Sequence, residues 1–142
     1  MTLDGVFDFI RGKRFGVVAA ADRSGAPEAA LVGFALTPDR RLVFDTSAQS
    51  RKAINLAARP EVAFVVGWDD AISVQIEGFA HAAAGAELAA VKEAYFAAWP
   101  DGRGREIWPD IAYIVIAPRW LRCADFAAGP EIVEFRLDRA EP

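Results

Sequence analysis

Short apolar segments separated by tight turns make up most of this chain, and they constrain its fold more than any other feature. Strand-like segments are expected at residues 15–21, 28–36, 41–46, 61–68, 72–82, 111–117, 119–124 and 132–137. Parallel strands need a crossover of a dozen or more residues, whereas antiparallel strands can be joined by a tight turn. Only one connection, at residues 86–99, is long enough for a sizeable helix. The pattern therefore predicts a mainly β, antiparallel barrel with peripheral helices.

Two residues are expected to interrupt the strands. Residues 72–77 alternate between apolar and polar side chains, and Gly78 ends this alternation. A glycine inside a strand usually marks a bulge or a bend, so the strand is expected to curl there. Pro118 separates the segments 111–117 and 119–124, which are predicted as two strands.

Three helices are predicted around the strands. Near the start of the chain, Leu3, Val6, Phe7 and Ile10 share one stripe of an amphipathic helix that should cover one end of the sheet. The longest helix is expected at residues 86–99. A short helix should begin at Ser50 and end at Arg59, because the residue before Pro60 is pushed out of the α region.

Composition excludes several classes of protein. The 142 residues are expected to form a single domain, and no apolar run approaches the length of a membrane span. No secretory signal is visible at the start, which makes a cytoplasmic location the expectation. One cysteine and one histidine argue against a disulfide and against a zinc or copper site. A net charge of -4 argues against a nucleic-acid partner.

A strand that runs into a hydroxyl-rich loop and a basic helix start forms the candidate functional segment. The strand at residues 41–46 ends at Thr46, and Ser50 is placed to cap the helix that follows. Arg51 and Lys52 then add positive charge at a helix end whose free N–H groups already favour an anion. Two cations in a first helical turn oppose the helix dipole unless an anion lies among them. The residues indicate either a phosphate cradle or a solvated basic turn.

The chain resembles the flavin-binding split-barrel family related to pyridoxamine 5'-phosphate oxidase. The resemblance covers roughly residues 16–82 well and the last third of the chain loosely. Its motifs are Phe-Asp-Thr at 44–46, Ser-Arg-Lys at 50–52, Asn-Leu at 55–56, Arg-Pro at 59–60 and Gln-Ile-Glu-Gly at 75–78.

This resemblance implies a six-stranded antiparallel split barrel with Greek-key connections. It also implies a homodimer with flavin mononucleotide (FMN) in a groove at the subunit interface. Ser50, Arg51 and Lys52 would bind the phosphate, and Thr46 would contact the phosphate or the ribityl chain. The other expected cofactor contacts are Phe44 and Asp45 along the isoalloxazine edge, Gln75 in preference to Ser73 at the ring, and Trp120 as an interface or cofactor residue.

Two departures from the family pattern limit what the resemblance implies. The oxidase has an Arg-x-x-Leu-Leu-Lys run on the preceding strand, and both cations are missing from the corresponding residues 30–35. Its substrate signature Arg-Leu-His-Asp-Arg has only an approximate counterpart at residues 136–139, which lacks the histidine. The chemistry of pyridoxine phosphate is therefore not expected here.

The leading hypothesis is an FMN-dependent oxidoreductase that uses a small-molecule substrate or electron donor. No acid or base stands out as catalytic, because His81 is expected at a strand end on the surface and Cys123 as a buried hydrophobe. The alternatives are a deazaflavin-binding or haem-binding member of the same fold, a non-catalytic flavin-binding protein, or a plain dimerisation module.

Overall fold

Helices and strands form close to the positions that the apolar pattern predicts. The computed structural model describes residues 1–127 and 129–137. Its elements are α1 (Leu3–Arg11), β1 (Phe15–Ala21), β2 (Pro27–Gly33), β3 (Ala35–Leu36), β4 (Leu42–Ser47), α2 (Arg51–Ala58), β5 (Glu61–Val66), β6 (Ile72–Ala82), α3 (Ala86–Ala98), the 3-10 helix η1 (Pro100–Arg105), β7 (Ile111–Asp125) and β8 (Glu131–Arg136). Asp138 and Arg139, which belong to the approximate substrate signature, lie outside the described residues.

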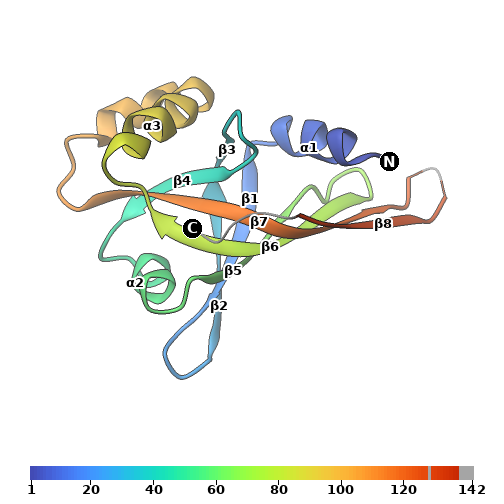
Figure 1. The fold of residues 1–142 in the computed structure, drawn as a ribbon, viewed down its shortest axis with the longest axis horizontal. Coiled ribbons are helices and arrows are strands. Elements are labelled where there is room, and N and C mark those ends of the chain that lie inside the picture. Colours follow the sequence, from blue (N-terminus) through green and yellow to red (C-terminus); the bar gives the residue numbers. More distant parts are fainter. Residues whose placement is uncertain (128, 138–142) are drawn as a thin grey trace.

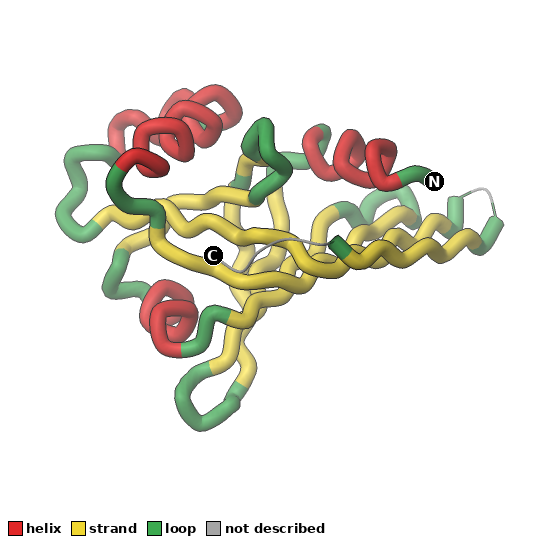
Figure 2. The backbone as a smooth tube through the Cα atoms, viewed as in Figure 1, coloured by secondary structure: helices red, strands yellow, loops and turns green. Residues whose placement is uncertain are grey.

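The strands form one curled sheet in which hydrogen-bonded neighbours run antiparallel (Figures 1 and 2). Their order is β2-β1-β5-β6-β7-β4-β3, and β8 pairs with β7. The predicted antiparallel split barrel is therefore confirmed. The described residues contain eight strands rather than the six that the resemblance implies.

One of the additional strands arises because the predicted strand 28–36 divides at Phe34. Before this residue β2 pairs with β1, and after it β3 pairs with β4. The Phe34 side chain is buried, and its N–H donates to the Arg14 carbonyl at 3.0 Å. The chain thus turns a corner between two parts of the sheet.

Gly78 and Pro118 lie opposite each other at a bulge between β6 and β7. The register shifts between Glu77 and Gly78, which confirms the predicted irregularity at this glycine. The predicted break at Pro118 is wrong, because β7 continues through it. Proline is tolerated at a bulge, where the hydrogen-bond ladder is already interrupted.

Two apolar clusters hold the helices against the sheet. The larger fills the inside of the curl, where Val6, Phe7 and Ile10 of α1 join it. α3 covers a second cluster on the opposite face of β3, β4 and β7 (Figure 1). Among the described residues, no helix has the length and apolar character needed to cross a membrane.

Candidate functional site

The junction between β4 and α2 is held by a local set of hydrogen bonds. Thr46 Oγ1 donates to Ser50 Oγ at 3.0 Å, and the Ala53 N–H donates to the same Ser50 oxygen at 3.2 Å. Ser50 is extended and caps α2, as its position in the sequence predicts. The Ala48 N–H donates to the Asp110 carbonyl at 2.6 Å, which ties the loop to the residue before β7.

Two cations follow this cap without a counter-charge. Arg51 is exposed and Lys52 is half-buried, and neither forms an ion pair within residues 1–127 and 129–137. The first turn of α2 contains no acidic residue. A guanidinium, an ammonium and a hydroxyl are suitable partners for a phosphate. Thr46, Ser50, Arg51 and Lys52 thus fit a phosphate, and we call them the cradle.

Phe44 and Asp45, which precede the cradle, have different surroundings from those expected. Phe44 is completely buried in the large apolar cluster. The ring therefore belongs to the core, and a contact of Phe44 with an isoalloxazine edge would involve its main chain. Asp45 points to the opposite face of β4, where its carboxylate is already engaged beneath α3.

Asp45 is bonded through both carboxylate oxygens. Tyr95 Oη donates to Oδ1 at 3.0 Å, and Arg105 Nε donates to Oδ2 at 2.7 Å. Arg105 Nη2 also donates to Tyr95 Oη at 3.2 Å. The hydrogen bond to Asp45 raises the pKa of the Arg105 guanidinium, and burial, reinforced by Asp45, raises the pKa of Tyr95 to about 12. Sequence reasoning did not link Tyr95 or Arg105 to Asp45.

Gln75 and Trp120 are not brought to the cradle of the same chain. Thr46 pairs with Ala112 of β7, whereas Gln75 pairs with Arg122 of that strand. Ten residues of extended strand span about 33 Å. Trp120 instead borders a groove of about 690 Å³ on the outer side of β1, β5, β6 and β7, together with Glu61, Glu77 and Arg136.

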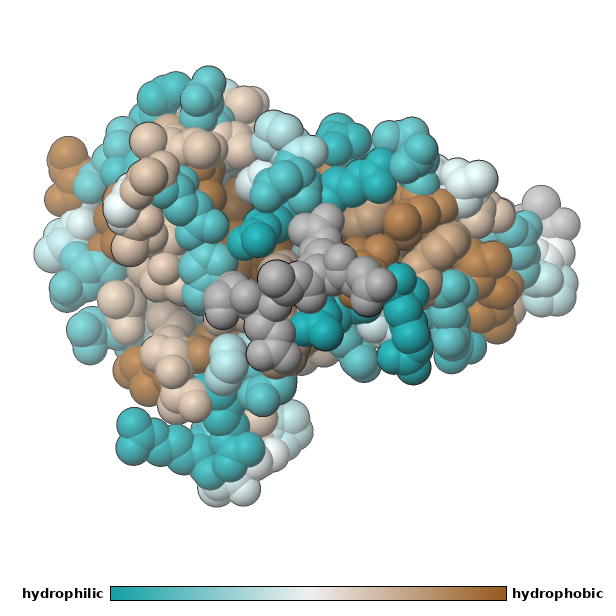
Figure 3. Space-filling view, viewed as in Figure 1, coloured by the Kyte–Doolittle hydropathy of each residue, from teal (hydrophilic) through white to brown (hydrophobic). Residues whose placement is uncertain are grey.

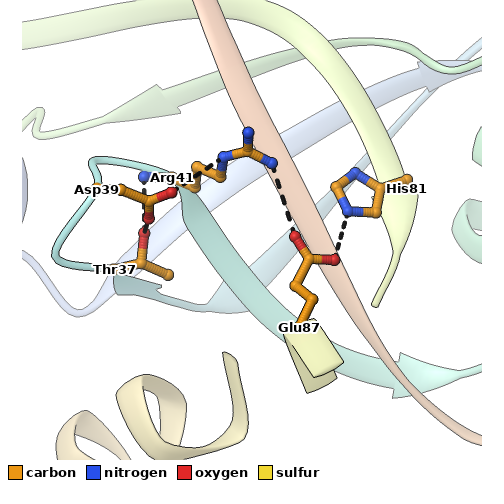
Figure 4. Close-up of polar contacts among 5 residues, drawn as sticks. All are labelled: Thr37, Asp39, Arg41, His81 and Glu87. Carbon is orange, nitrogen blue, oxygen red and sulfur yellow. Dashed lines mark hydrogen bonds and ion pairs between the residues drawn. The ribbon is translucent and has the colours of Figure 1, made fainter. Parts of the chain in front are cut away.

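His81 belongs to a polar cluster at the other end of α3 (Figure 4). Its Nε2 lies 2.7 Å from Glu87 Oε1, and Glu87 Oε2 lies 3.6 Å from Arg41 Nη1. The Arg41 guanidinium also lies 3.3 Å from Asp39 Oδ2. His81 is half-buried rather than on the open surface. Cys123 is buried, as expected, and burial raises the pKa of its thiol.

Comparison with known proteins agrees with the fold described above. The curled antiparallel sheet places the chain among the split-barrel proteins. The family model described as pyridoxamine 5'-phosphate oxidase matches residues 3–123, and the chain belongs to this family. No curated protein sequence matches the chain.

Several solved structures share the fold. A haem binding protein from Mycobacterium smegmatis is 20% identical with a TM-score of 0.80, and the match covers 92% of this chain and 55% of that protein. General Stress Protein 26 from Bacillus anthracis is 24% identical with a TM-score of 0.71, covering 96% of this chain and 100% of the other. A pyridoxamine 5'-phosphate oxidase-related, FMN binding protein from Nostoc punctiforme is 14% identical with a TM-score of 0.66, covering 89% and 87%. At these identities the likeness concerns the fold alone.

Proposed function

We propose that the protein is an oxidoreductase that binds FMN through the cradle. The observation that carries the proposal is the pair of cations, Arg51 and Lys52, beside the linked hydroxyls of Thr46 and Ser50. Membership of the pyridoxamine 5'-phosphate oxidase family supports it. Bound flavin would supply hydride or electron transfer, while the protein supplies binding and orientation. We assign no catalytic side chain.

Haem is the second candidate, because a structural neighbour is a haem binding protein. The imidazole of this chain is poorly placed to bind iron. His81 Nε2 contacts Glu87, and His81 Nδ1 is buried. This arrangement favours a flavin over a histidine-ligated haem. Deazaflavin remains a rival, since the cradle would suit any ligand with a phosphate.

We further propose that the protein is a homodimer whose partner copy completes the site. A single chain leaves Gln75 and Trp120 far from its own cradle. Leu31 on β2 is 63% exposed on the outer face of the sheet. Large apolar side chains are also exposed between β5 and β6 (Trp68), after β7 (Phe126) and in β8 (Ile132). Figure 3 shows apolar surface on the arm formed by β6, β7 and β8, at the right of the view. Burial of these side chains against a second copy would remove them from water.

The proposal is tested by titrating the purified protein with FMN, riboflavin, deazaflavin and haem, monitored by absorbance and flavin fluorescence. We expect FMN to bind more tightly than riboflavin, because riboflavin lacks the phosphate. Replacing Arg51 and Lys52 together by Ala should cost several kcal/mol of FMN affinity, on the order of two charge-assisted hydrogen bonds. Riboflavin affinity should change little.

Arg59 provides the matched control, because it adds a cation at the other end of α2. It donates to the Arg23 carbonyl at 2.9 Å. Arg59→Ala should leave FMN affinity unchanged.

A wild-type protein that binds no FMN would refute the proposed function, and an unchanged FMN affinity in the Arg51→Ala/Lys52→Ala variant would place the phosphate elsewhere. Reduction of bound flavin by NADH or NADPH would separate an enzyme from a carrier, and sedimentation equilibrium would test the dimer.

A further inference from the structure

Asp45 lies in β4 immediately before the cradle, and its carboxylate points to the face of the strand that α3 covers. Its side chain is only 11% exposed, so water screens its charge poorly. A poorly screened carboxylate one residue away from an anion site repels a phosphate dianion unless a cation compensates it. Thr46, the next residue in the strand, contributes its hydroxyl to the cradle.

Arg105 supplies this compensation from a distant part of the chain. Its Nε donates to Asp45 Oδ2 at 2.7 Å, while Tyr95 occupies the other carboxylate oxygen. Arg105 also has Asp101 near its Nη1 at 3.7 Å, but that carboxylate is 72% exposed and therefore screened. Asp45 is thus the close, poorly hydrated partner of this guanidinium.

The segment that carries Arg105 contacts the cradle loop at a second point. After η1 the chain leads to Asp110, whose carbonyl accepts the Ala48 N–H at 2.6 Å. Ala48 lies between Thr46 and Ser50 in the loop. Residues 105–110 therefore have two roles: Arg105 neutralises Asp45, and Asp110 holds the loop between Thr46 and Ser50.

We propose that Arg105 is a positioning residue of the phosphate site: it fixes and neutralises Asp45 so that the cradle can accept a phosphate. This inference rests on the proposed function. It also changes the role of Asp45 from a flavin contact to an anchor beneath α3. Arg105 itself touches no ligand, because its donors face Asp45, Tyr95 and Asp101.

Arg41 offers a matched control for a purely structural role. Its side chain is 26% exposed, close to the 24% of Arg105, and it contacts Glu87 near the start of α3 (Figure 4). Both arginines link α3 or η1 to the sheet, but Arg41 lies at the end of β4 away from the cradle. Loss of Arg41 should lower stability without changing phosphate recognition.

The experiment measures Kd for FMN and for riboflavin in wild-type protein and in variants, each at a temperature where it is folded by circular dichroism. Arg105→Ala and Arg105→Gln should raise the Kd for FMN about tenfold, because the uncompensated and poorly screened Asp45 carboxylate would then repel the phosphate. Riboflavin should change less than about threefold on the same reasoning. Arg105→Lys, which keeps the charge, and the double variant Asp45→Asn/Arg105→Gln should both stay near wild type.

The outcomes separate the two proposals. Wild-type protein that binds no FMN overturns the proposed function and this inference with it. Normal FMN binding by Arg105→Gln overturns the inference alone. Equal losses for FMN and riboflavin, or an equal loss of FMN in Arg41→Ala, would also overturn it, because they indicate a structural role. If Arg105→Ala does not fold, Arg105→Gln and the double variant decide the question.

Discussion

Replacement of Gly78 by alanine should destabilise the protein strongly. A Cβ at this position would lie 2.1 Å from the Ala117 carbonyl oxygen and 3.1 Å from Pro118 Cα. These atoms belong to the backbone of β7, which is held by β4 up to Ile116 and by β8 from Trp120, so it cannot shift freely. Optimal separations of non-bonded heavy atoms are about 3.5 Å or more. The strands must therefore separate at the bulge.

We expect a loss of about 3 kcal/mol, at the upper end of the usual cost of overpacking. For a domain of this size the melting temperature should fall by about 10 °C. Urea denaturation followed by tryptophan fluorescence measures the change. Gly104→Ala is the control, since no atom lies within 4 Å of its added Cβ, and it should change stability by less than about 0.5 kcal/mol. A Gly78→Ala protein within about 1 kcal/mol of wild type would refute the reasoning.

Two further predictions concern buried polar contacts. Burial and Asp45 raise the pKa of Tyr95 from the ordinary value of 10.0 to about 12. Between these two pH values the folded state keeps a proton that the unfolded state releases. The free energy of unfolding should therefore fall as the pH rises from about 10 to about 12. Tyr95→Phe should remove that part of the alkaline decline in the urea midpoint, and identical declines in both proteins would contradict it. Asn55 Nδ2 donates to Glu28 Oε1 at 2.9 Å, so Asn55→Ala should cost about 1 to 2 kcal/mol in the same assay. An unchanged midpoint would show that this bond contributes nothing.

Features set by neighbouring residues were predictable from the sequence. Ser50 can accept from the start of α2 because a hydroxyl at that position reaches the free N–H groups, and Pro60 ends the helix through local sterics. The irregularity at Gly78 follows from the missing side chain. The position of the cradle in the chain was therefore predictable, although its ligand was not.

Features set by distant residues were not predictable in this way. The strand alternation shows that Asp45 and Phe44 face opposite sides, but not that α3 covers the side of Asp45. Arg105 ends η1, far along the chain, and no local pattern links it to a carboxylate in β4. The continuation of β7 through Pro118 was not predictable either, because proline is tolerated there only through the bulge opposite it in β6. Each outcome depends on tertiary contacts that override local preference.

The length of β7 has a consequence for how the protein is made. This strand pairs with β6, β4 and β8, so β4 has no partner on that side until residues 111–125 have been synthesised. Pairings between distant segments form late, because the intervening chain must be ordered first. We therefore expect an incomplete chain that ends before β7 to expose the edges of β4 and β6 and to require protection from aggregation. The loop that follows β4 acquires its contact with Asp110 only in that last stage.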